Sequence, residues 1–180
     1  MTQACEIAQL GAKALRQHAN YVEDFNEPNI RQLIADMKAA LATTQGVGLA
    51  APQISQLKRI IIVASRPSSR YPKAPLMSPT VMINPTFTAL SGEKEKDWEG
   101  CLSIPGIRAL VPRYKAIHVQ YTDEQGNPVE QQLGGFVARV FQHEADHLDG
   151  KVYLDRVESS LDIISESEYF KLFTNLEASL

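Results

Sequence analysis

The sequence predicts an α+β fold in which mixed or antiparallel strands surround one central helix. Three observations lead to this prediction. Segments of strand character fall between residues 58 and 133, helical periodicity flanks them on both sides, and the helix that follows them carries the motif His143-Glu144-Ala145-Asp146-His147. A chain of 180 residues, 44% of them hydrophobic, is long enough for one domain with its own core. We therefore expect residues 1–180 to form a single domain.

The first long element is a helix. A capping Asn26 and Pro28 in the first turn mark its start, and apolar residues at helical spacing continue it to about residue 44. Gly46 is expected to end it. The segment before it, residues 1–25, offers only apolar anchors, which we take to be Leu10, Leu15 and Val22.

Two strands follow, and a long loop separates them. The β-branched run at 58–64 predicts a buried strand, and residues 81–85 predict a short one that Asn84-Pro85 closes. The four prolines and several serines of residues 65–80 indicate a connecting loop. Residues 91–97 are highly charged and predict a hairpin or a loop.

The second half of the chain contains the clearest strand. Residues 116–122 alternate, so that Ile117, Val119 and Tyr121 face the core while His118 faces solvent. A turn at 123–127 leads into a strand at 129–133, and Gly134-Gly135 opens the motif helix, which Gly150 ends. We expect a short edge strand at 152–154 and a last helix at about 160–178.

Composition narrows the range of partners. The net charge is -3, so no basic field draws the chain to nucleic acid or to an anionic membrane. Cys5 and Cys101 are too few for a disulfide framework, which favours a reducing compartment. The first ten residues lack the basic start of a secretory signal, and no apolar run reaches membrane-spanning length. We expect a cytosolic protein without a membrane or a specific nucleic-acid partner.

The motif helix itself indicates a metal site. His143 and His147 lie four residues apart, about 40° in projection, so both imidazoles can reach one ion, and Glu144 lies on the same broad side. A helical projection places these three with the apolar residues and puts Arg139, Gln142 and Asp146 on the opposite side. The apolar residues are Phe136, Val137, Val140, Phe141 and Leu148. Burying three ionisable groups is costly without a metal or a hydrogen-bond network. The alternative is a satisfied pair of core histidines.

The third ligand remains open on residues alone. No histidine follows His147, and the downstream carboxylates Glu158, Glu166 and Glu168 lie in a polar stretch. Cys101 would suit zinc or ferrous iron, but taken alone it reads better as a small buried cysteine. The glycine-rich segment 46–53 lacks the third glycine and the Lys-Ser/Thr ending of a phosphate loop, so we expect a turn that supports a site.

Three segments together resemble the signature motifs of the peptide deformylases. They are Gly46-Val47-Gly48-Leu49-Ala50-Ala51-Pro52-Gln53, Glu99-Gly100-Cys101-Leu102-Ser103 and Gln142-His143-Glu144-Ala145-Asp146-His147, in that order. The resemblance covers about residues 26–157. It implies the α+β peptide-deformylase fold and a single catalytic domain. It also implies hydrolysis of the N-formyl group from the N-terminal formyl-methionine of newly synthesised polypeptides, with release of formate.

The resemblance also assigns roles to residues. It implies that Cys101, His143 and His147 hold one Fe²⁺, with Zn²⁺, Ni²⁺ or Co²⁺ as substitutes. Glu144 matches the general base. The remaining carried-over residues contact the substrate: Gln53 and the N–H of Leu102 donate to the formyl oxygen, Gly48 offers its backbone, and Val47, Glu99 and Val140 are candidates around the methionine pocket. The role of Arg108 stays open.

A mechanism follows from these roles. We expect Glu144 to take a proton from the attacking water, Gln53 and the Leu102 N–H to stabilise the oxyanion, and Glu144 to return the proton to the leaving amine. The expected partners are formyl-methionyl nascent peptides, with a transient ribosome contact, and a monomeric state. Lys171 is the sole basic residue of the C-terminal helix, so charge gives docking on ribosomal RNA little support.

The chain departs from the family pattern in two places. Residues 11–16 lack a proline that members often carry before Leu-Arg, and the 65–80 loop resembles an insertion of one branch of the family. Two rival functions remain. One is a peptidase that takes its third ligand from a downstream carboxylate; the other is a non-enzymatic homologue or structural metal module. Intact Glu144 and Gln53 argue against the second, because a structural site needs neither.

Overall fold

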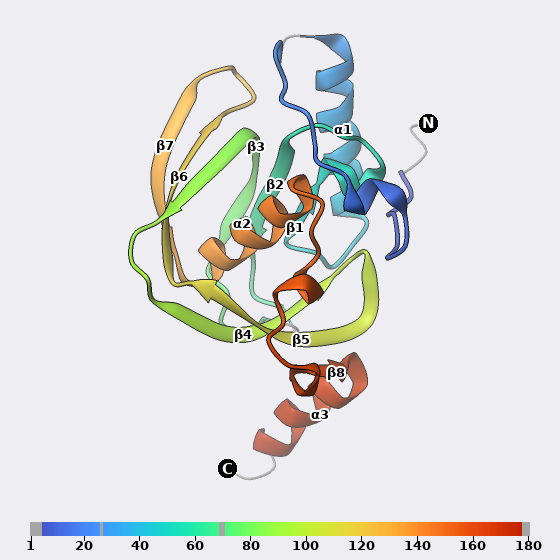
Figure 1. Ribbon diagram of the computed structural model, residues 1–180, viewed down its shortest axis with the longest axis vertical. Coiled ribbons are helices and arrows are strands. Elements are labelled where there is room, and N and C mark those ends of the chain that lie inside the picture. Colours follow the sequence, from blue (N-terminus) through green and yellow to red (C-terminus); the bar gives the residue numbers. More distant parts are fainter. Residues whose placement is uncertain (1–4, 26, 69–70, 178–180) are drawn as a thin grey trace.

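Two antiparallel sheets enclose one helix in the computed structural model, which describes residues 5–25, 27–68 and 71–177 (Figure 1). The five-stranded sheet has the order β1-β2-β3-β6-β7, and the three-stranded sheet has the order β4-β5-β8. All pairings between these strands are antiparallel. Of the mixed or antiparallel strands predicted for the α+β fold, the antiparallel arrangement is the one observed. The strands are β1 (Gly48–Ala50), β2 (Ile60–Ser65), β3 (Met77–Ala89), β4 (Lys94–Cys101), β5 (Ile104–Tyr114), β6 (Ala116–Thr122), β7 (Pro128–Gly134) and β8 (Ile163–Ser165).

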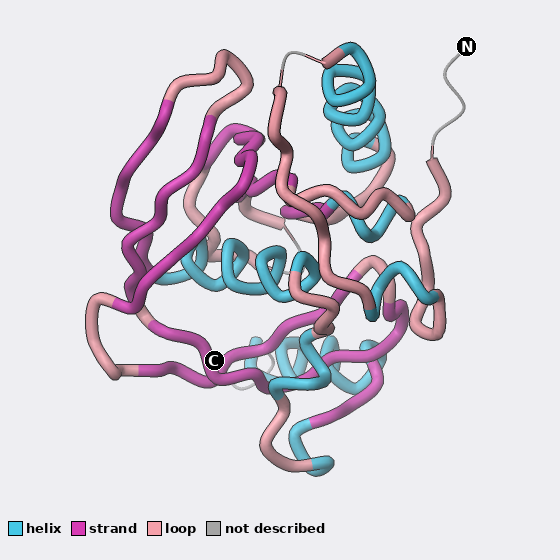
Figure 2. Tube along the Cα trace, turned by 45° about the horizontal axis from the view of Figure 1, so that its top comes forward, coloured by secondary structure: helices cyan, strands magenta, loops and turns pink. Residues whose placement is uncertain are grey.

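The helices occupy three separate positions. α2 (Gly135–Leu148) crosses the middle of the molecule, α1 (Pro28–Ala42) covers the far face of the larger sheet, and α3 (Glu166–Glu177) lies against the smaller sheet (Figure 2). Short 3₁₀ turns complete the chain: η1 (Lys13–Arg16), η2 (Ala51–Ile54), η3 (Tyr153–Arg156) and η4 (Ser160–Asp162). The central position of α2 brings the predicted motif helix into contact with both sheets.

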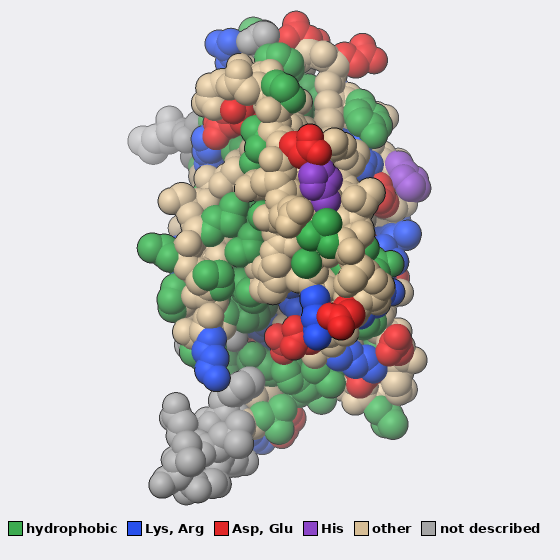
Figure 3. Space-filling model, turned by 90° about the vertical axis from the view of Figure 1, so that its left-hand side faces the viewer, with side chains coloured by type: hydrophobic (Ala, Val, Ile, Leu, Met, Phe, Trp, Pro, Cys, Tyr) green, Lys and Arg blue, Asp and Glu red, His purple; other side chains and the backbone are tan. Residues whose placement is uncertain are grey.

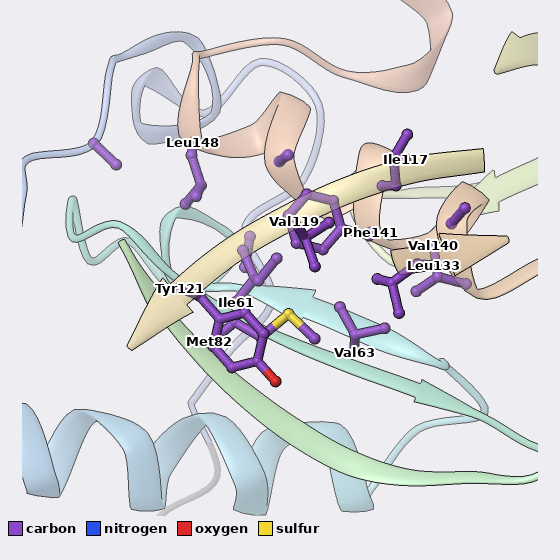
Figure 4. Close-up of a cluster of buried hydrophobic side chains, with 14 residues drawn as sticks. Ile61, Val63, Met82, Ile117, Val119, Tyr121, Leu133, Val140, Phe141 and Leu148 are labelled. Atoms are coloured by element: carbon purple, nitrogen blue, oxygen red, sulfur yellow. The ribbon is translucent and has the colours of Figure 1, made fainter. Parts of the chain in front are cut away.

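Strand β2 shows how the larger sheet serves two cores. Its side chains alternate between the faces, so Ile61 and Val63 point to α2 while Ile60 and Ile62 point to α1. The α2 side is drawn in Figure 4, where side chains of β2, β3, β6 and α2 fill one cluster. Burial on both faces explains why this strand reads as a continuous apolar run in the sequence.

The predicted first helix is confirmed, but its end is not where we expected. Pro28 lies in the first turn and the apolar stripe is buried, yet the helix ends at Ala42, four residues before Gly46. Asn26, the expected cap, lies outside the described residues. Of the expected N-terminal anchors, Leu15 and Val22 are buried, whereas Leu10 is 47% exposed, so that prediction was wrong.

Strand β3 is longer than the sequence suggested on both sides. It begins at Met77, inside the predicted loop, and it continues past Asn84-Pro85 to Ala89. Asn84 has a φ of 51° at a register shift, and its side-chain amide exchanges two hydrogen bonds of 2.9 Å with the backbone of Val22. The Asn-Pro pair therefore forms a bulge inside the strand rather than its end.

The largest error concerns the smaller sheet. Residues 91–97 were expected to form a hairpin or loop, but they lead into β4, and β5 was not predicted at all. The expected edge strand at 152–154 is wrong as well, because this segment opens the 3₁₀ turn η3. The last helix begins at Glu166 instead of residue 160; η4 and β8 come first.

The surface shows mixed charge. On the face drawn in Figure 3, acidic and basic side chains are interspersed among polar and apolar ones. His118 lies on β6 with its side chain 29% exposed and 2.6 Å from Glu130 Oε1, in agreement with its predicted outward direction. Among the described residues, no helix is both long enough and apolar enough to cross a membrane.

The turn after α2 gives a prediction about stability. Gly150 has a φ of +68°, and a Cβ atom there would come within 2.9 Å of the Arg16 backbone. We expect Gly150→Ala to lower the free energy of unfolding by about 1–2 kcal/mol or more, through left-handed strain plus the clash. Urea denaturation measures this. Gly92→Ala is the control, because nothing lies within 4 Å of a Cβ at that position; equal stability loss in both variants would contradict the prediction.

Candidate metal centre

Three separate segments meet at one hollow. Helix α2 brings His143 and Glu144, the β4–β5 hairpin brings Cys101 and Leu102, and β1 with η2 brings Gly48 and Gln53. The hollow has a volume of about 60 Å³. Its wall includes all the predicted site residues except His147: Val47, Gly48, Gln53, Glu99, Cys101, Leu102, Val140, His143 and Glu144. His147 is fully buried and lies beside Cys101.

Cys101, His143 and His147 form a metal-capable group. One ligand atom from each lies within 4.8 Å of the others, and Cys101 Sγ is 3.4 Å from His147 Nε2. The two imidazole rings stand at 74° to each other with centroids 5.3 Å apart. Burial raises the pKa of the Cys101 thiol, but the two histidines lower it more, so the pKa falls well below its usual value. A thiolate with two imidazoles is a donor set typical of Zn²⁺ and Fe²⁺ sites.

Glu99 fixes the orientation of His143. Its Oε2 lies 2.8 Å from His143 Nδ1, which leaves Nε2 as the ring atom directed to the site. The Tyr153 ring stacks beside the same imidazole at 5.8 Å. Both Glu99 oxygens are occupied by buried partners, and the residue is only 4% exposed. Glu99, the predicted candidate contact of the methionine pocket, lines the hollow, and its carboxylate bonds His143 and two arginines.

Four buried side-chain polar atoms have no hydrogen-bond partner among the described residues: Arg59 Nε, Arg108 Nε, Glu144 Oε2 and His147 Nδ1. Glu144 and His147 belong to the candidate site, and Arg108 lines the hollow. Burial raises the pKa of Glu144 to about 7, close to the value that suits a general base at neutral pH. Unsatisfied buried atoms are costly, so the unpaired Glu144 oxygen fits a site that completes its bonding with a reactant.

Glu144 and Gly48 depend on each other. A Cβ atom at residue 48 would come within 2.3 Å of Glu144 Oε1. Only glycine therefore lets the edge strand β1 pass the carboxylate at this distance. The glycine-rich segment was expected to support a site, and its glycine does so by making room for the side chain of the motif helix.

Gln53 is held with its amide nitrogen toward the cysteine. Its Oε1 accepts from the backbone N–H of Ala50 at 2.8 Å. Its Nε2 then lies 3.2 Å from Ser103 Oγ and 3.5 Å from Cys101 Sγ. The amide orientation is thus set from behind, which leaves a donor group beside the candidate metal ligands.

The polar side of α2 corrects our helical projection. Arg139, Gln142 and Asp146 lie opposite the apolar side as expected, but they are at most 7% exposed, because the smaller sheet covers them. Asp146 Oδ2 accepts from Arg113 at 2.6 Å, and its Oδ1 accepts from Arg156 at 2.6 Å. α2 is therefore buried on both sides, one apolar and one charged.

Sequence reasoning missed several residues around the hollow. Arg113 on β5 donates two hydrogen bonds to Glu99, of 2.9 and 3.0 Å, and Tyr71 and Phe136 line the hollow with ring centroids 4.8 Å apart. Arg108, whose role we left open, donates to the Tyr71 hydroxyl at 2.9 Å. The largely apolar run of residues 107–111 could have indicated β5, and with it the place of Arg113.

Comparison with known proteins gives a consistent family match. The family model described as polypeptide deformylase matches residues 4–162. The chain is 56% identical over 168 residues to peptide deformylase 2 of Nostoc, which covers 93% of this chain and 94% of that protein. It is 46% identical over 151 residues to peptide deformylase 2 of Bordetella bronchiseptica, covering 84% and 86% respectively.

Solved structures match as well. A class I type b peptide deformylase from Acinetobacter baumannii with bound Met-Ala-Ser superposes with a TM-score of 0.84 at 42% identity, over 87% of this chain and all of that one. A peptide deformylase from Synechococcus elongatus in complex with actinonin gives 0.78 at 36% identity, over 90% and 84%.

The buried charges give a prediction about acid stability. Burial alone would raise the pKa of Glu99, but Arg113 and His143 outweigh it and hold this pKa well below the usual 4.5. Burial would likewise raise the pKa of Asp146, but Arg156 and Arg113 hold it below 3.8. A carboxyl group whose pKa is lower in the folded than in the unfolded chain stabilises the fold at pH values above its unfolded-state pKa. This stabilisation is lost as the pH falls towards the folded-state pKa. We expect the free energy of unfolding to decline as the pH falls below about 4.5.

Arg113→Met tests the cause. Removing this partner leaves two buried carboxylates under-compensated, so at pH 7 the variant should lose about 3–5 kcal/mol. Its stability should also depend less steeply on acid, since the Glu99 pKa is no longer held down. Urea denaturation at several pH values measures both. Lys115→Met, at an exposed pair 3.6 Å from Glu93, is the control. An unchanged acid slope in Arg113→Met would refute this account.

Proposed function

The chain belongs to the polypeptide deformylase family and hydrolyses the N-formyl group from newly synthesised polypeptides, and we propose that Cys101, His143 and His147 hold its catalytic metal. The observation that carries this proposal is the meeting of the three ligand atoms beside an unpaired, buried Glu144. A structural site would need no carboxylate with a raised pKa, and a burial-raised pKa is what a general base needs.

We propose the following catalytic roles for the protein side chains and the Leu102 backbone. When bound, the metal supplies Lewis-acid chemistry, which polarises the formyl carbonyl and makes nearby water more acidic. Glu144 accepts a proton from the attacking water and then passes it to the amine that leaves. The Gln53 amide and the Leu102 N–H donate to the oxygen of the formyl group as negative charge develops on it. Formate and a free amino terminus are the products.

The methionine side chain is proposed to lie against the apolar wall of the hollow. Val47, Val140, Phe136 and Trp98 line it, and Gly48 presents a bare backbone beside the reacting centre. β1 is an edge strand, because among the described strands it pairs only with β2, so an extended peptide can approach its free side. We therefore propose that a formyl-methionyl nascent peptide lies along β1 with its formyl group at Glu144.

The remaining assignments are also proposals. Deformylases depend on a metal, and the soft thiolate favours Fe²⁺ as the resident ion, with Zn²⁺, Ni²⁺ or Co²⁺ as substitutes. The relatives are bacterial and the substrate is a new polypeptide, which supports the bacterial cytosol as the location. We propose a single catalytic domain that works as a monomer and touches the ribosome transiently.

A peptidase with a downstream carboxylate ligand is the main rival, and Cys101→Ala separates the two. We expect iron-loaded wild-type protein to release formate from a formyl-Met-Ala-Ser peptide, while Cys101→Ala binds metal much more weakly and loses activity. Formate release and metal content after gel filtration are the measurements. Cys5→Ala, outside the site, is the matched control. Full metal content and turnover in Cys101→Ala would refute the ligand set.

Glu144→Gln tests the base separately from the metal. The variant keeps the size of the side chain but cannot accept a proton, so kcat should fall by at least about 100-fold, the lower range for general base catalysis. Metal content should stay equal to wild type, because Glu144 is not one of the three ligands. If kcat survives in Glu144→Gln with metal bound, another group is the base.

A further inference from the structure

Arg139 lies where the pocket wall meets the metal centre. It is one helical turn before His143 on α2, and it is 7% exposed. Its side chain lines the substrate hollow. Neither the family resemblance nor the mechanism gives it a role. A buried arginine needs several acceptors, so the partners of its guanidinium show what it holds together.

Those partners all belong to the smaller sheet. Arg139 Nη1 donates to Glu99 Oε1 at 2.9 Å and to the Val111 carbonyl at 2.7 Å. Nη2 donates to the Glu95 carbonyl at 2.6 Å, and Nη1 is 3.5 Å from that of Asp97. One planar group thus bonds β4 at several points and β5 at one. A flexible ammonium would not match so many acceptors at once.

The metal ligands come from the two elements that Arg139 joins. His143 and His147 lie on α2, and Cys101 is the last residue of β4, two residues after Glu99. The spacing of the three ligand atoms therefore depends on how α2 is seated against β4. We propose that Arg139 is a positioning residue that clamps α2 to β4 and so sets the geometry of the Cys-His-His metal site.

The clamp also acts through Glu99. Arg139 and Arg113 Nε both donate to Glu99 Oε1, while Oε2 accepts from Arg113 Nη2 and bonds His143 Nδ1. Without Arg139, Arg113 alone among the arginines holds this carboxylate, and no arginine of α2 ties it to the helix. β4 can then shift against α2, and the contact that orients His143 shifts with it. Partners of this kind change metal affinity about 10–100-fold when they are removed. The inference rests on the proposed metal ligands.

Arg139→Met is the direct test. Methionine keeps an unbranched apolar stem against the hollow but removes every donor. We expect the affinity for Co²⁺, measured by competition with a chromophoric chelator, to fall about 10-fold or more. The visible d–d spectrum of the Co²⁺ protein should shift, because it reports ligand geometry.

Two further variants keep the test decisive. Arg156, in η3, pairs with Asp146 of α2, so Arg156→Met removes an ion pair of this helix without changing a contact to β4. The Co²⁺ affinity and spectrum of this control should match wild type. Arg139→Lys retains the charge and the stem and should give intermediate affinity; it also serves if Arg139→Met does not fold. Circular dichroism and urea denaturation establish that each variant is folded.

The outcomes separate three cases. A folded Arg139→Met or Arg139→Lys with wild-type Co²⁺ affinity and spectrum overturns the clamp, even if it is less stable, because a merely structural role predicts that result. Failure of the wild-type protein to bind Co²⁺ would instead refute the proposed metal ligands. Equal spectral shifts in Arg139→Met and Arg156→Met would assign the effect to general loss of positive charge around α2, and would also overturn the proposal.

Discussion

The buried carboxylate of Glu99 is the group on which the site depends. It is 4% exposed, and it accepts hydrogen bonds from Arg113, Arg139 and His143. An isolated carboxylate in such a place would be very unfavourable, so its cations must be held within hydrogen-bond distance. One cation comes from β5 and the other from α2. Satisfying this one charge therefore locks the hairpin to the helix and carries Cys101 to the two histidines.

The two sides of α2 divide the work of stability and positioning. Phe141 and Leu148 pack against the larger sheet in an apolar core. Burial of this core stabilises the fold, but apolar contacts are not directional and tolerate small shifts of the helix. Arg139 and Asp146 face the smaller sheet through directional bonds, which fix distance and angle. A metal site needs both, because ligand atoms must be held to within fractions of an ångström.

The sequence pattern predicted those elements whose buried side can be recognised from the spacing of their own apolar residues. Alternation gave β6, helical spacing gave α1, and the motif gave the ligands on α2. It failed for β4, whose exposed Lys94 and Glu95 look like a loop until β5 pairs with them. The buried arginines could not be foreseen either, since acceptors distant in sequence compensate them. Glu99, for one, lies 14 residues from Arg113 and 40 from Arg139.

Two carboxylates near the site are treated in opposite ways, and this contrast explains the shape of the hollow. Glu99 is fully bonded and its pKa is depressed, so it stays charged as part of the scaffold. Glu144 keeps one oxygen unpaired and its pKa is raised to about 7, so it can exchange a proton near neutral pH. That unpaired carboxylate must stand open to the reactant, which Gly48 allows by passing without a side chain. The glycine of the first motif is thus a requirement of the base in the third, although the two lie nearly 100 residues apart in the printed sequence.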